Sequence, residues 1–120
     1  YGFAIWENIQ EEFDKKFKLG AVLAVGGKVL ARTSNQIRIF DPSIMAFVKI
    51  IELGEPCNWM VANGDRAATL FGAEHMYEMD IQTGEIEQVM ALPGRVTTAT
   101  RTPDGDLYFA KGTELYKVIG

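Results

Sequence analysis

The chain has 120 residues, of which 48% are hydrophobic and 23% charged, in the ordinary range for one soluble globular domain. Its formal net charge is −4 and its 12 lysines and arginines are scattered along the sequence, so we expect no nucleic-acid binding. No apolar run approaches the roughly 18 residues of a membrane span, so we expect no membrane insertion. The single cysteine, Cys57, excludes an internal disulfide and is expected to be buried as a small hydrophobe.

A short apolar segment that ends in leucine and glycine, with or without an intervening proline, recurs three times. The glycines that close it are Gly20, Gly54 and Gly94, which lie 34 and 40 residues apart. This spacing is typical of repeats built from four short strands. It predicts an array of small sheets.

Turn residues divide each repeat into segments of strand length. Ala21 to Val25 is nearly all apolar, as expected for an inner strand packed on both faces. The first hairpin of each repeat carries a dipeptide suited to positive φ, namely Gly26-Gly27, Asn63-Gly64 or Asp104-Gly105. The expected strands are 21–25, 28–33, 36–40 and 47–53 in a first unit (21–54), 59–62, 66–71, 75–80 and 86–92 in a second (55–94), and 96–102, 106–110 and 114–119 in an incomplete third (95–120).

Residues 1–20 allow two interpretations. Ile5 to Gly20 aligns without gaps with Ile39 to Gly54, which predicts the outer hairpin of a preceding unit. The same stretch has apolar residues at helical spacing and opposite charges four residues apart, which would suit a helix that ends at Gly20. We expect the hairpin, because tertiary pairing overrides local propensity in repeats, and the helix is the alternative.

Three segments resemble the third strand and following turn of β-propeller repeats. They are Ile-Trp-Glu-Asn (5–8), Ile-Phe-Asp-Pro (39–42) and Tyr-Glu-Met-Asp-Ile-Gln-Thr-Gly-Glu (77–85). The resemblance covers essentially the whole chain and is shared by WD-repeat, YVTN-type and quinoprotein-like propellers. It implies an all-β fold of four-stranded antiparallel meander blades, with about three blades' worth of strands.

A propeller closes with roughly four to eight blades, more than this chain holds. The first residue is Tyr1, and both ends of the sequence fall inside a repeat. The flanks of the terminal sheets need covering. We therefore expect further blades, either from the same chain or from copies of it.

Few residues suit catalysis. His75 is the only histidine, so a Ser-His-Asp triad, a Cys-His pair or a three-histidine metal site has no second candidate. The acidic residues among positions 7–14 are expected to form a solvated face. The sequence predicts a non-enzyme with no metal site and no cofactor.

Binding residues are expected on the loops that lead into the innermost strands, because loops on a rigid scaffold are free to carry function. Asn58, Trp59 and Arg95 would offer an amide, a large amphipathic ring and a positive fork there. The function these features favour is a scaffold that binds a protein or peptide. The alternatives are blades of a quinoprotein-like or lactonase-like propeller whose active residues lie elsewhere, and a self-assembling lectin-like ring.

Overall fold

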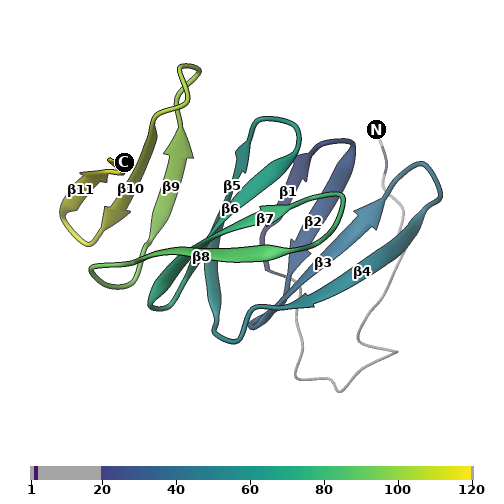
Figure 1. Cartoon of the computed structure of the whole chain (residues 1–120), viewed down its shortest axis with the longest axis horizontal. Coiled ribbons are helices and arrows are strands. Elements are labelled where there is room, and N and C mark those ends of the chain that lie inside the picture. The colour runs from purple at the N-terminus through teal and green to yellow at the C-terminus, as the bar shows by residue number, and fades with distance from the viewer. Residues whose placement is uncertain (1, 3–19, 120) are drawn as a thin grey trace.

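The computed structural model describes Gly2 and residues 20–119, which form three antiparallel sheets (Figure 1). The all-β prediction is confirmed, because the elements of the described residues are all strands. The hairpin and helix interpretations of residues 1–20 concern positions that, apart from Gly2 and Gly20, lie outside the described residues. None of the described residues forms a helix long and apolar enough to cross a membrane.

Each sheet is a meander in which consecutive strands pair. The first sheet contains β1 (Val22–Val25), β2 (Lys28–Arg32), β3 (Gln36–Asp41) and β4 (Ala46–Glu52). The second contains β5 (Cys57–Asn63), β6 (Ala67–Gly72), β7 (His75–Asp80) and β8 (Ile86–Ala91). The third contains β9 (Thr98–Arg101), β10 (Leu107–Lys111) and β11 (Glu114–Lys117).

In each antiparallel sheet the strands turn at two opposite ends. We use the word edge for such an end of the strands, and not for an outer strand. The hairpins β1–β2, β3–β4, β5–β6, β7–β8 and β9–β10 lie at one edge, which we call the hairpin edge. The turns β2–β3, β6–β7 and β10–β11 lie at the opposite edge, together with the connections from one sheet to the next. We call this second edge the connecting edge.

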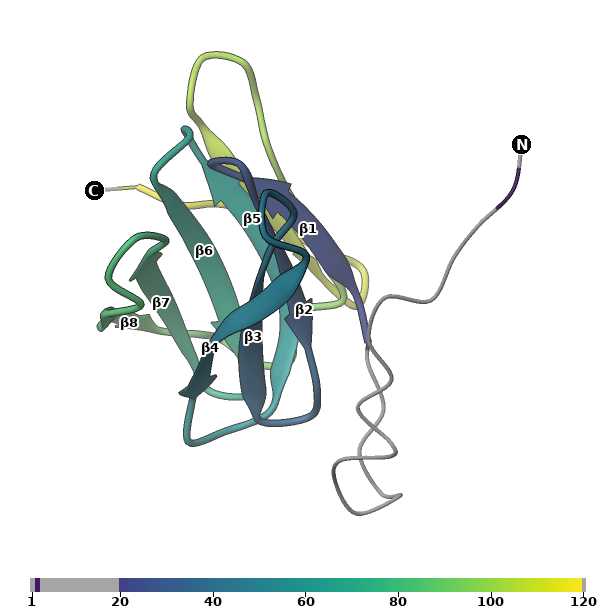
Figure 2. The same cartoon turned by 90° about the vertical axis from the view of Figure 1, so that its right-hand side faces the viewer.

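The core lies between the sheets, and the second sheet is covered on both faces. Successive side chains of a strand point to opposite faces, and β6 has buried side chains on both faces. Leu70 packs in a cluster with residues of the first sheet, whereas Phe71 packs with residues of the third. Both side chains are fully buried. Figure 2, turned by 90°, shows the first two sheets packed one against the other.

The described residues cover only one face of the first strand, β1. Residues 21–25 were expected to be packed on both faces, but the side chain of Val22 is 64% exposed. Leu23 and Val25 pack in the cluster shared with the second sheet, and alternation along β1 places Val22 on the opposite face. Only one face of β1 is therefore covered by the second sheet.

The first two sheets also meet at their hairpin edges. Gly26 in the β1–β2 turn has a φ of 58°, and a β-carbon built on it would lie 2.2 Å from the backbone oxygen of Asp65 in the β5–β6 turn. The neighbouring Gly27 has a φ of 74° and open space around the same position. The glycine at position 26 therefore allows two backbones to approach closely.

These two glycines give a matched test of that approach. Both Gly26→Ala and Gly27→Ala place a β-carbon on a left-handed residue, so their difference isolates the contact with Asp65. We expect Gly26→Ala to lower the free energy of unfolding by about 1–3 kcal/mol more than Gly27→Ala, because overpacking forces a backbone to shift. Urea denaturation of both variants measures this difference, and equal losses would contradict the close approach.

Candidate functional site

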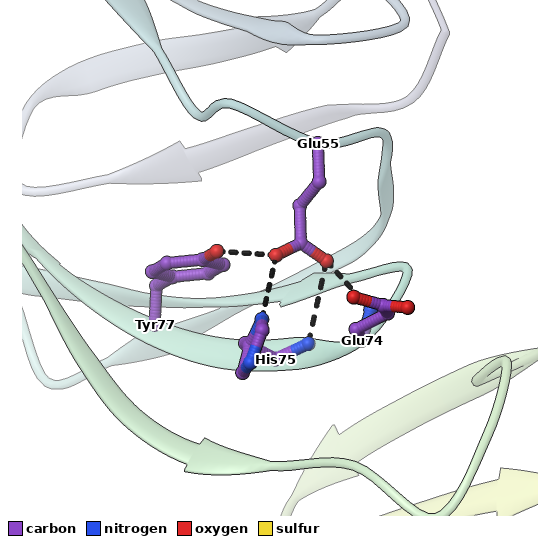
Figure 3. Close-up of polar contacts among 4 residues, drawn as sticks. All are labelled: Glu55, Glu74, His75 and Tyr77. Atoms are coloured by element: carbon purple, nitrogen blue, oxygen red, sulfur yellow. Dashed lines mark hydrogen bonds and ion pairs between the residues drawn. The ribbon is translucent and has the colours of Figure 1, made fainter.

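The connecting edge of the second sheet carries a cluster of polar side chains around Glu55. Glu55 lies in the connection between β4 and β5, and its carboxylate reaches the β6–β7 turn (Figure 3). Oε1 accepts hydrogen bonds from the backbone N–H of Glu74 at 2.6 Å and of His75 at 3.3 Å. Oε2 accepts from the His75 Nδ1 at 2.9 Å and from the Tyr77 hydroxyl. One carboxylate thus joins two segments that lie about twenty residues apart.

Electrostatics hold this carboxylate in its charged form. The Glu55 side chain is only 15% exposed, and this burial acts to raise its pKa. The hydrogen bonds from Tyr77, Glu74 and His75 outweigh burial and lower the pKa of Glu55 to about 2. Burial and the bond to Glu55 raise the pKa of Tyr77 to about 12. At neutral pH the cluster is therefore a carboxylate surrounded by donors.

The local sequence makes room for this contact. A β-carbon built on Gly72, the last residue of β6, would lie 2.5 Å from the Glu55 Oε1. Gly72 follows the expected strand 66–71, and its lack of a side chain leaves the space that the Glu55 carboxylate occupies.

Asn58 and Trp59 both lie in strand β5, whereas Asn58 was expected in the preceding loop and Trp59 where that loop meets the strand 59–62. Strand β5 begins at Cys57, and both side chains are half-buried near its start. The Trp59 Nε1 donates a hydrogen bond to the backbone oxygen of Ala99 in β9 at 3.1 Å, and its ring packs in the cluster shared with the third sheet. Trp59 therefore joins the second and third sheets at the connecting edge.

Arg95 lies exposed in the connection from β8 to β9. It follows Gly94, as Glu55 follows Gly54, so the two residues occupy equivalent places in successive repeats. A β-carbon on Gly94 would lie 2.5 Å from the Lys111 Cε, which places the lysine side chain beside Arg95's connection. The same repeat position thus carries an inward-facing carboxylate in one connection and an exposed guanidinium in the next.

The remaining chemistry of the described residues is limited. Within residues 20–119, no three histidine, cysteine or acidic side chains converge as metal ligands do. Cys57 is buried as predicted, at 1% exposure, and burial raises the pKa of its thiol to about 11. A thiol in this state is a packing residue at neutral pH.

The cluster predicts a specific dependence of stability on pH. Because the pKa of Glu55 falls from the ordinary 4.5 to about 2 on folding, its contribution is complete above about pH 4.5 and is lost as the pH falls towards 2. At pH 7 we expect Glu55→Gln to lower the free energy of unfolding by about 1–3 kcal/mol. Between pH 4.5 and 2 the free energy of unfolding of this variant is also expected to fall less steeply than that of the wild type. Denaturant unfolding at several pH values measures both.

Glu74→Gln is the matched control for this prediction. Glu74 is exposed and contributes its backbone N–H to the cluster, which the substitution keeps. Its stability and pH profile are expected to match the wild type. A Glu55→Gln profile parallel to that of the wild type would contradict the role of the Glu55 carboxylate.

Comparison with known proteins identifies the fold. No protein-family model and no curated protein matches the sequence. Similar solved structures include the extracellular domain of a hybrid two component system from B. thetaiotaomicron, with a TM-score of 0.67 and 15% identity over 85% of this chain and 14% of that one. They also include a chain of the mitotic checkpoint complex, with a TM-score of 0.67 and 15% identity over 82% of this chain and 36% of that one.

A third similar structure is the β-propeller domain of Myceliophteria thermophila Cps50 (Swd1), with a TM-score of 0.60 and 13% identity over 85% of this chain and 41% of that one. The described residues are therefore β-propeller blades, as the sequence predicted, and no propeller subfamily is singled out. The chain spans less than half the length of each of these three solved chains.

Proposed function

We propose that these blades belong to a non-catalytic propeller scaffold that binds a protein or peptide at the connecting edge. The observation that carries the proposal is the Glu55 cluster, which fixes the β4–β5 connection to the β6–β7 turn through both carboxylate oxygens. A surface held in one conformation loses less entropy on binding. The edge is therefore suited to recognition by preformed groups.

The groups that this rigid edge offers to a partner are polar and charged. Arg95 is exposed, Glu74 is exposed, and the ring of His75, the residue after Glu74, is partly exposed. Arginine is enriched at protein interfaces, where its planar fork binds carboxylates and backbone oxygens. In this proposal Arg95 contacts the partner, while Trp59 and Asn58 support the edge from β5.

Two further considerations support a protein partner. The net charge of −4 disfavours nucleic acid and anionic membranes as ligands, because neither attracts an acidic chain. One of the similar structures is a chain of the mitotic checkpoint complex, an assembly of proteins. In the proposed scaffold, further blades complete the ring, supplied by the same chain or by copies of it.

The proposal predicts a selective effect of Arg95. Co-purification of the intact protein identifies its partner, and titration calorimetry then measures the affinity of that partner for purified variants. We expect Arg95→Ala to weaken binding about tenfold, in the range of an interface residue of intermediate importance. The control is Arg66→Ala, which removes another exposed arginine from the opposite, hairpin edge and is expected to change affinity less than twofold.

Two results would contradict the proposal. One is an unchanged affinity of Arg95→Ala for the identified partner. The other is turnover of a small-molecule substrate by the purified protein, which would indicate that the blades belong to an enzyme.

A further inference from the structure

The hairpin edge contains two turns that begin with the same capping aspartate but differ in the residues that follow it. Asp41 begins the β3–β4 turn and Asp80 begins the β7–β8 turn. The Asp41 Oδ1 accepts the Ser43 N–H at 2.9 Å, and the Asp80 Oδ1 accepts the Gln82 N–H at 2.8 Å. The two turns therefore share the same aspartate cap and can be compared position by position.

Counting from these aspartates, the third and fourth positions differ in chemistry. The β7–β8 turn has Thr83 and Gly84, whereas the β3–β4 turn has Ile44 and Met45. Gly84 has a φ of 75° and Met45 a φ of 54°, so both backbones are left-handed. Glycine adopts this conformation without strain, while a methionine β-carbon crowds the following carbonyl.

Met45 is the single non-glycine residue with positive φ among the described residues. Backbone strain of this kind persists where the side chain is needed, and it concentrates at ligand contacts. The Met45 side chain is 46% exposed and that of Ile44 is 62% exposed, so neither is held in place by burial in the core. The strain therefore presents two large apolar side chains to solvent, and we call Ile44 and Met45 the apolar tip.

The apolar tip is held in a fixed shape. The Asp41 Oδ1 accepts a second bond from the Ser43 hydroxyl at 2.6 Å, and the Ile44 N–H donates to the Asp41 backbone oxygen at 3.3 Å. Pro42 fixes its own φ between them. A convex tip whose backbone is already ordered needs little further ordering when it binds.

The charges around the tip indicate the chemistry of its partner. Lys28 lies beside the base of the turn, and its Nζ pairs with the Asp41 Oδ2 at 3.6 Å. This pair leaves the tip without net charge, and the whole chain is acidic, so an anionic lipid surface gains no attraction here. A convex uncharged tip fits a concave uncharged pocket, and methionine adapts to the irregular walls of such pockets.

We propose that Ile44 and Met45 insert into an uncharged apolar pocket of a partner protein. This second interaction surface lies at the hairpin edge and does not depend on the connecting edge or on Arg95. The two side chains would be buried together in this pocket. They would supply most of the affinity, as a few buried residues do in many interfaces.

The test exchanges the apolar tip for the sequence of the other turn. The double variant Ile44→Thr/Met45→Gly carries the residues that fold normally in the β7–β8 turn. A photo-crosslinking residue at position 44 of the intact protein captures the partner, and a crosslinker at position 83 is the control. The affinity of the captured protein is then measured for the wild type, the double variant and Val89→Thr, which removes an apolar side chain of 48% exposure from β8.

We expect a protein to crosslink at position 44 and not at position 83. Its affinity for the double variant is expected to fall at least tenfold, and its affinity for Val89→Thr to change less than twofold. The melting temperature of the double variant is expected to equal or exceed that of the wild type, because the strain at position 45 is relieved.

Four outcomes would overturn the proposal. These are the absence of a crosslinked protein, an unchanged affinity of the double variant, and a lowered melting temperature, which would make the tip a structural feature. The fourth is binding to phosphatidylcholine–phosphatidylserine vesicles that is lost in the double variant, which would make the ligand a membrane. Each leaves the test of Arg95 unaffected, so the two proposals fail separately.

Discussion

The rest of the structure depends on the packing of each sheet against its neighbour. Along β6, Leu70 turns to the first sheet and Phe71 to the third, so a single strand contributes to two separate cores. Burial of this apolar surface is the main favourable term available to a small sheet. A four-stranded meander alone would leave both faces in water, which is why repeats of this kind are stable only in stacks.

Polar contacts between sheets complement this packing. The Arg32 Nη1 donates to the backbone oxygen of Cys57 at 2.8 Å, and the Arg101 Nη1 donates to that of Ala62 at 2.6 Å. In both pairs an arginine of one sheet satisfies a carbonyl of the inner strand β5. These bonds orient neighbouring sheets as well as stabilise them, since a guanidinium has fixed donor directions. The Glu55 cluster does the same for two connections of one edge, and this links the stability of the blades to the surface they present.

Much of the fold could be predicted from the sequence because its signals are local. Alternating residues in 36–40 and the Asn63-Gly64 dipeptide specify a strand and a hairpin through backbone preferences that neighbouring sheets reinforce. The exposure of Val22 could not be predicted, because a run of apolar residues shows that a strand can be buried but not which sheets cover it.

The candidate site was less accessible to prediction for a physical reason. Two of the donors to Glu55 are backbone N–H groups, of Glu74 in the β6–β7 turn and of His75 at the start of β7, and no side chain in the sequence indicates them. Glu55 lies between the expected strands 47–53 and 59–62, yet its partners lie about twenty residues away in the sequence. Trp59 was selected for its ring, and the bond to Ala99 shows that such a ring can serve the contact between sheets. The left-handed backbone at Met45 likewise could not be predicted from the sequence, because methionine does not favour this conformation.

Native-state hydrogen exchange measured residue by residue tests the central claim most directly. Strands β2, β6 and β10 are each paired on both sides, and only β6 belongs to a sheet with described neighbours on both faces. If packing between sheets dominates stability, the amides of β6 exchange at least tenfold more slowly than those of β2 and β10 in this 120-residue chain measured without further blades. Equal protection in the three strands, or faster exchange in β6, would show that each sheet is stable by itself and would contradict the account.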